Sequence, residues 1–430
     1  MSNIRLRDCI NKVPDLIERA GELGYSCIAI TDHEAICGHI KAQKYAQTIK
    51  EKYPNLKVIL GNEIYLVRNG LNSDNFNSKK DRYFHFILLA CDEIGHKQIR
   101  EISTRAWRRS YMARGMRRVP TYYQDIIDII GSNPGHVIGS SACLGGQLAQ
   151  KILSNEIDYC RAWCQRMVEI FGEGYFYLEM QPSFSKEQIV VNKQIKILSQ
   201  ELNIPYIITT DAHYLNSEDR FIHKAFLNSQ NGDREVDDFY ETTFLMNDEQ
   251  IRKYFSYFTP QEINIAYDNI ISIQDKCKDY SLAKPLKIPE LLWHKPKSEI
   301  INPKWFDLIP EIFTFYNSDY YGDKVLAQLI VERLESAPND LYLNSKKAYD
   351  EINACLEMTR ISSNVNRTHW SAYFLNLQRI VDECWNAGTL VGCGRGSGVG
   401  FILLYILGIT QINPLREKTA TFRWRLTRKG

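Results

Sequence analysis

The feature that most constrains the fold is an alternation of short apolar runs and longer amphipathic segments over about the first 230 residues. The short runs are often β-branched, which is typical of strands, and the longer segments have the apolar spacing of helices. This alternation predicts an α/β fold with a parallel sheet or barrel. The expected strands cover residues 27–31, 57–63, 84–91, 136–140, 175–180 and 206–210, and the expected helices cover 13–24, 39–52, 100–109, 122–131, 155–171 and 186–202.

Composition excludes several other classes of protein. With 44% hydrophobic and 24% charged residues, the 430-residue chain resembles an ordinary globular protein with room for two or three domains. Its longest apolar run, Val399–Ile409, is about half of what a membrane helix needs. The N-terminal residues lack the pattern of a secretion signal, and the eleven cysteines include no C-x-x-C pair. We therefore expect a cytoplasmic protein with reduced thiols and no membrane partner.

Side chains that can bind metals stand at or beside the expected strand ends. In α/β barrels the loops that follow the strands gather the active-site groups. Asp211 and His213 would lie on the same face of an extended segment, where they could share a metal ion. Taken singly, each candidate has an ordinary alternative explanation, such as a polar loop or a small core cysteine. Together they predict a zinc or manganese site, and the candidate ligands are His33, Glu63, His85, Cys143, Asp211 and His213.

The second half of the chain has a different character. Residues 246–280 are expected to be helical, and Lys284–Pro289 is a linker punctuated by prolines. The clearest amphipathic runs after it are residues 325–334 and 348–361. We therefore place a domain boundary near residue 285.

A glycine-rich loop is the sharpest motif of this second half. It runs from Val391 to Gly400 and leads into an apolar segment expected to be helical. Successive glycine amides can form an anion-binding nest, to which Arg395 and Ser397 would add a charge and a hydroxyl donor. The glycine spacing matches neither a P-loop nor a dinucleotide-binding fingerprint. A flexible turn before a buried helix is the alternative, so the residues alone leave phosphate binding at Gly394, Arg395, Gly396 and Ser397 open.

The first-half motifs resemble those of the polymerase-and-histidinol-phosphatase (PHP) domain, in the form found at the head of bacterial DNA polymerase III alpha subunits. The resemblance is carried by residues 30–33, 61–63, 84–86, 140–146 and 210–215. It implies a distorted seven-stranded α/β barrel that holds up to three metal ions. By this resemblance the metal ligands are Asp8, His33, Glu63, His85, Cys143, Asp211 and His213.

The glycine loop extends the resemblance into the second half. With residues 372–375 upstream and 407–415 downstream, Gly394–Ser397 resembles the start of the polymerase palm, whose loop holds the triphosphate of the incoming nucleotide. The resemblance thus implies a PHP domain over residues 1–284 and the N-terminal part of a palm, mostly helical, over 285–430.

The resemblance implies a DNA-directed DNA polymerase, a nucleotidyltransferase of DNA replication. Its implied partners are primer–template DNA, deoxynucleoside triphosphates and replisome proteins such as a sliding clamp. Zn²⁺ or Mn²⁺ would occupy the PHP domain, and Mg²⁺ would serve polymerisation in the complete enzyme.

Two departures from the family pattern shape what we expect of this chain. The His-x-His strand that opens the family's barrel is missing, and no aspartate follows Asp382, although the family's catalytic aspartates follow the palm segment. We therefore expect an incomplete portion without catalytic palm residues. The alternatives are a free-standing metal-dependent phosphoesterase or 3′–5′ exonuclease, and a catalytically inactive replisome scaffold.

Positive charge is concentrated in one segment of the sequence, although the formal net charge of the chain is only +2. Residues 105–118 contain six arginines and no acidic residue, with Trp107 and Tyr111 four positions apart. Such a segment could bind phosphates and stack on unpaired bases, or it could be an ordinary solvated helix face. A second basic run, Arg423–Lys429, lies near the end of the sequence.

Overall fold

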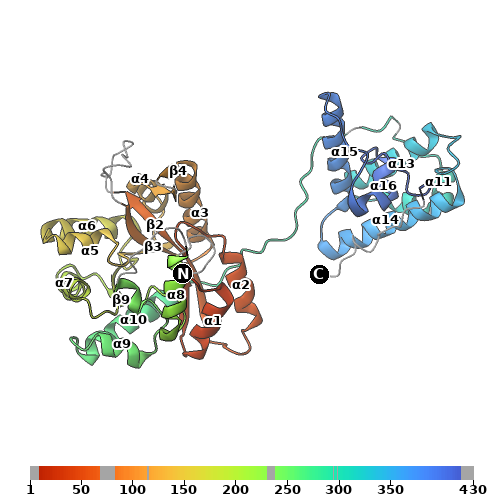
Figure 1. Cartoon of the computed structure of the whole chain (residues 1–430). Helices are drawn as coiled ribbons and strands as arrows, with labels where there is room; N and C mark the ends of the chain where they lie inside the picture. The colour runs from red at the N-terminus through yellow and green to blue at the C-terminus, as the bar shows by residue number, and fades with distance from the viewer. Residues whose placement is uncertain are drawn as a thin grey trace. The chain divides into compact units, whose positions relative to one another are not determined.

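The structure is a computed structural model that describes residues 9–67, 83–113, 116–229, 238–293, 295–297 and 299–417. The chain divides into two compact units, Met1–Ala283 and Lys284–Gly430, coloured red to green and green to blue in Figure 1. Among the described residues, no helix combines the length and the apolar character needed to cross a bilayer.

Unit 1 is an α/β structure built on one seven-stranded sheet. The strands follow the order β1-β2-β3-β7-β8-β9, and β6 pairs with β2. Their bounds are β1 Cys27–Ile30, β2 Lys57–Val67, β3 Tyr83–Ala90, β6 Pro120–Thr121, β7 Val137–Ser140, β8 Phe176–Met180 and β9 Tyr206–Ile208. A separate hairpin pairs β4 (Tyr111–Ala113) with β5 (Met116–Arg118). The predicted α/β class is confirmed.

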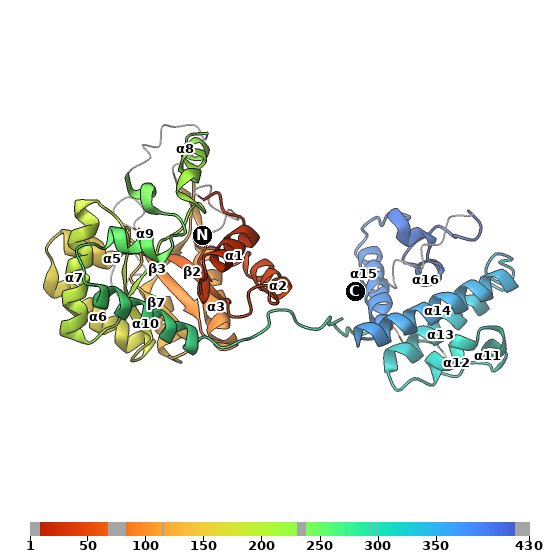
Figure 2. The same cartoon turned by 90° about the horizontal axis from the view of Figure 1, so that it is seen from below.

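Helices surround this sheet. In Figures 1 and 2, α1 and α2 lie together on one side of the sheet, and α5, α6 and α7 lie together on another. The helices of the unit are α1 Val13–Glu22, α2 His39–Thr48, α3 Glu93–Arg108, α4 Tyr123–Ile126, α5 Gln147–Leu153, α6 Ile157–Phe171, α7 Lys186–Leu202, α8 Arg220–Asn228, α9 Asp248–Tyr254 and α10 Pro260–Lys276.

The prediction of a wholly parallel sheet is wrong for β3, which runs antiparallel to both β2 and β7. The prediction that Glu63 ends its strand is also wrong. β2 continues to Val67, because Ile64 and Leu66 both enter the hydrophobic core and residues 61–67 pair with residues 83–89. Glu63 therefore lies inside a strand, opposite Ile87, and Tyr65 lies opposite His85.

Alternation along β2 and β3 separates the core from the site. Ile64, Leu66, Phe84 and Phe86 pack into the largest hydrophobic core. Glu63, Tyr65 and His85 alternate with these core residues and face the other side of the sheet, because successive strand residues point to opposite faces.

Unit 2 is helical, as predicted, and the described part of it contains no strand. Its helices are α11 Lys304–Leu308, α12 Pro310–Tyr316, α13 Tyr321–Ser336, α14 Lys346–Asn366, α15 Trp370–Asn386 and α16 Ile402–Ile406. They enclose a hydrophobic core of their own, centred on α13 and α14 and joined by Phe374 and by Phe401–Leu403.

Candidate metal centre and glycine loop

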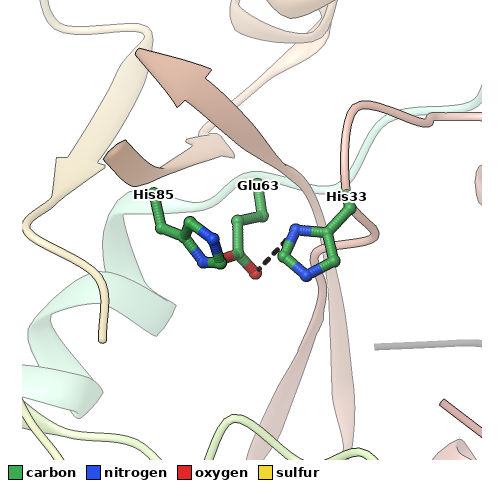
Figure 3. Close-up of side chains that lie close together, drawn as sticks. All are labelled: His33, Glu63 and His85. Atoms are coloured by element: carbon green, nitrogen blue, oxygen red, sulfur yellow. Dashed lines mark ion pairs between the residues drawn. The ribbon is translucent and has the colours of Figure 1, made fainter. Parts of the chain in front are cut away.

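Three predicted ligands meet on the inner face of the sheet. His33 follows β1, Glu63 lies within β2, and His85 is the third residue of β3. The Glu63 carboxylate lies between the two imidazole rings (Figure 3), with Oε1 2.6 Å from His85 Nδ1 and Oε2 3.6 Å from His33 Nδ1. One ligand atom from each residue lies within 4.8 Å of the others.

Cys143 supplies a fourth donor beside this cluster. Its Sγ lies 3.5 Å from His85 Nδ1, and the amide of Gly145 donates to it at 3.4 Å. The loop that presents this thiol requires a glycine, because a Cβ at Gly146 would stand 2.3 Å from the carbonyl oxygen of Ser141. The Ser-Ser-Ala-Cys-Leu-Gly-Gly motif therefore supplies both the Cys143 thiol and the glycine that the tight turn after it requires.

The electrostatics of the cluster suit a cation. Burial raises the pKa of Glu63, and His85 opposes that shift. Burial lowers the pKa of His85, but the neighbouring Cys143 and Glu63 outweigh burial and raise it well above its usual value. Burial also raises the pKa of the Cys143 thiol. His85 and Glu63 thus each favour the charged form of the other, and a divalent ion would also compensate the buried carboxylate.

Imidazole, carboxylate and thiolate donors at this spacing fit a zinc- or manganese-type ion better than calcium, which prefers oxygen ligands alone. The residues present therefore fit the metal that a PHP domain implies. The residues that would hold it are His33, Glu63, His85 and Cys143.

Asp211 and His213 follow β9, as expected, but not in extended conformation. Asp211 has a φ of +44°, so the argument from alternating strand residues does not apply. Their side chains still lie close, with His213 Nδ1 3.8 Å from Asp211 Oδ1. Asp211 lines the same cavity as Glu63 and Cys143, whereas the His213 ring packs against Tyr240. Asp8 lies outside the described residues.

Glu179 is a residue of this site that the sequence reasoning missed. It lies in β8, is buried, and accepts hydrogen bonds from the hydroxyls of Ser140 and Thr209, which end β7 and follow β9. It also lines the cavity of about 460 Å³ that contains Asp211. A carboxylate inside the apolar run Phe176–Met180 was the signal that could have revealed it.

The apolar segment after the glycine loop of unit 2 contains a short helix, as expected, but a turn separates this helix from the loop. Residues 396–400 form a 3₁₀ turn that begins within the Gly-Arg-Gly-Ser segment, and the α-helix that follows begins only at Ile402. The glycines have a conformational role. Gly394 and Gly396 have φ values of +138° and +71°, and a Cβ at Gly394 would stand 2.9 Å from Val399. Arg395 between them is exposed.

The arginine-rich segment is partly neutralised. Arg109 forms a two-pronged pair with Asp125 at 2.5 and 2.6 Å, and Arg105 pairs with Glu101 and Asp128. Arg114 and the basic run Arg423–Lys429 lie outside the described residues. The remaining arginines, 108, 117 and 118, carry what is left of the predicted positive patch.

Comparison with known families matches both halves. The PHP domain family matches residues 2–183, and the family described as the bacterial DNA polymerase III alpha NTPase domain matches residues 324–426. The second match includes the whole glycine loop.

Curated relatives align along nearly the whole chain. A DNA-directed DNA polymerase of Bacillus phage SPbeta is 34% identical, over 96% of this chain and 34% of its own length. DNA polymerase III alpha subunits of Borreliella burgdorferi and Aquifex aeolicus are 27% and 24% identical, over 96% of this chain and 32% and 33% of theirs. This chain thus spans about a third of the length of these relatives, and it contains a PHP domain match followed by a match to the bacterial DNA polymerase III alpha domain family.

Proposed function

We propose that the chain is part of a DNA-directed DNA polymerase of the polymerase III alpha type, with residues 1–284 as the PHP domain and 285–430 as the beginning of the palm. The observation that carries the proposal is the 34% identity to a phage DNA polymerase over 96% of the chain, because it includes both units. A free-standing phosphoesterase would not account for unit 2. Primer–template DNA and deoxynucleoside triphosphates are then the substrates, with Mg²⁺ for nucleotidyl transfer, a sliding clamp among the partners and the cytoplasm as the location.

Within this function, the Gly394–Ser397 loop would bind the triphosphate. Gly394 and Gly396 turn the backbone with positive φ values, which a side chain at either position would strain. Such turns let successive amide groups point toward one anion. Arg395 supplies a cation that no described carboxylate neutralises. A guanidinium can bind phosphate oxygens through two parallel hydrogen bonds.

Nucleotide titration tests this role. We expect deoxynucleoside triphosphates to bind the chain weakly, with a dissociation constant on the order of 1 mM or about −4 kcal/mol, because two amides and one cation make few contacts. Arg395→Ala should reduce this binding at least about tenfold, as expected for one lost charge-assisted contact of about 1.5–3 kcal/mol. Arg379→Ala on α15, whose guanidinium already pairs with Glu383, is the matched control. Equal binding by the wild type and Arg395→Ala would contradict the proposal.

The cluster in unit 1 favours a second activity, hydrolysis of phosphodiesters in the manner of a 3′–5′ exonuclease. Divalent ions at such a site polarise a phosphate and lower the pKa of bound water. The chain's own contribution is to hold them through His33, Glu63, His85 and Cys143, with Asp211 across the same cavity. Zn²⁺ and Mn²⁺ are the ions we propose.

Digestion of an end-labelled oligonucleotide with Zn²⁺ or Mn²⁺ added tests this activity. We expect shortening from the 3′ end by the wild type and none by Glu63→Gln, which keeps the shape of the side chain but removes its charge. Shortening that persists in Glu63→Gln would assign the activity to a contaminant or to another site.

A further inference from the structure

A row of tyrosine rings leads away from the metal cluster. Tyr65 follows Glu63 by two residues in β2, and its ring stacks on His33 with centroids 5.2 Å apart. Tyr83 precedes His85 by two residues in β3, and its ring lies 6.2 Å from Tyr65, edge to face. The Tyr83 hydroxyl is hydrogen-bonded to that of Tyr111 in β4. We call Tyr65, Tyr83 and Tyr111 the tyrosine row.

The far end of the tyrosine row carries positive charge. Arg118 pairs with Tyr111 in the β4–β5 register, and its guanidinium lies 5.7 Å from the centre of the Tyr83 ring. Arg117 beside it is exposed and donates to the hydroxyl of Ser110 at 3.0 Å. Over the ranges that the structure describes, neither arginine forms an ion pair with a carboxylate, unlike Arg105 and Arg109.

We propose that the tyrosine row, with Arg117 and Arg118, binds a single strand of nucleic acid and directs its end to the His33–Glu63–His85 cluster. Aromatic faces in sequence stack on successive bases, and arginines beside them contact the phosphates between those bases. A duplex keeps its base faces stacked inside and could use only the charges. A free phosphate or mononucleotide would not need an extended row of three rings.

This inference rests on the proposed hydrolytic function for what happens at the cluster, but binding itself can be measured without hydrolysis. The probe is a fluorescein-labelled oligothymidylate of about 12 nucleotides, within the range of site sizes known for single-strand binding folds. Anisotropy is recorded with the full chain in excess EDTA, so that no metal-dependent cleavage occurs. A matching RNA oligonucleotide and a DNA duplex form parallel arms.

We expect Tyr111→Leu to weaken binding of the single strand about tenfold, as loss of one stacking platform does, and Tyr111→Phe to retain it. The double variant Arg117→Gln/Arg118→Gln should flatten the slope of log affinity against log salt by about 1.4, or 0.7 for each phosphate contact. Lys186→Gln, which removes an exposed charge from the start of α7, is the matched control and should change neither quantity.

Photo-crosslinking locates the bound strand, because the polymerase unit could also bind DNA. With 4-thiothymidine in the probe, we expect crosslinked peptides that contain Tyr83 or Tyr111. Crosslinks confined to other segments, equal affinity for the duplex, or equal losses in Lys186→Gln and the arginine double variant would each overturn the inference. If the strand binds as expected but survives intact with Zn²⁺ or Mn²⁺, the hydrolytic proposal fails while this one stands.

Discussion

Among single residues, Glu63 is the one on which the metal centre depends most, because its two oxygens reach both His33 and His85. We expect Glu63→Gln to weaken binding of Zn²⁺ or Mn²⁺ by at least about tenfold, since even residues that only orient a ligand contribute that much. Elemental analysis after dialysis against either ion measures it. Glu169→Gln on the exposed face of α6 is the control, and equal metal content in both variants would rule out Glu63 as a ligand.

Residue types alone indicate much of this site, because metal donors beside apolar strands are visible in a sequence. The family resemblance and the strand ends predict that His33, Glu63, His85 and Cys143 approach one another. They do not predict the conformation of Asp211, because a left-handed residue in a loop leaves no pattern. Glu179 escapes the same reasoning because its partners, Ser140 and Thr209, are distant in sequence and meet only in the sheet.

At the scale of elements, strand direction was the main property that the sequence could not provide. Parallel and antiparallel strands alternate buried and exposed residues in the same way, so the pattern of β3 fits either direction. Direction depends on the connection before it, here the undescribed residues 68–82. The antiparallel pairing has a consequence for the site, because it sets Tyr65 opposite His85 and so joins the tyrosine row to the cluster.

A buried histidine pair joins three elements of unit 1. His39 is the first residue of α2. Its Nδ1 is hydrogen-bonded to Nε2 of His96 in α3 at 3.0 Å, and its Nε2 is hydrogen-bonded to the carbonyl oxygen of Gly61 in β2 at 2.8 Å. The carbonyl only accepts, so His39 Nε2 carries a proton, its Nδ1 accepts, and His96 Nε2 donates. Two neutral rings are enough to satisfy both hydrogen bonds.

This pair predicts acid sensitivity. Burial lowers the pKa of both rings, and burial together with the neighbouring His39 lowers that of His96 to about 4. Between pH 6.5 and 4 the His96 side chain binds a proton in the unfolded chain but not in the folded one, so the free energy of unfolding falls as pH falls through this range. Urea unfolding at pH 7 and pH 5 measures this effect. Between these two pH values, His96→Gln, which retains a hydrogen-bond donor toward His39, should lose less free energy of unfolding than the wild type. The same pH dependence in both proteins would place the sensitivity elsewhere.

At the scale of the whole molecule, each unit has its own hydrophobic core. Among the described residues, the cores of unit 1 draw only on positions before 284, and that of unit 2 draws only on positions after 300. Each unit is large enough to bury a core without the other, since domains commonly contain about 100–150 residues. The two units should therefore unfold in separate transitions rather than as one cooperative system.

A core substitution in one unit tests this independence. Leu326 in α13 is fully buried, and Leu326→Ala should destabilise unit 2 by about 2–5 kcal/mol, through lost burial and the cavity that remains. In calorimetry the transition of unit 2 should move to lower temperature while that of unit 1 stays in place. Leu178→Ala in β8 is the reciprocal variant and should move only the transition of unit 1. If either variant moves both transitions together, the units stabilise each other, and metal binding in unit 1 would then also affect nucleotide binding in unit 2.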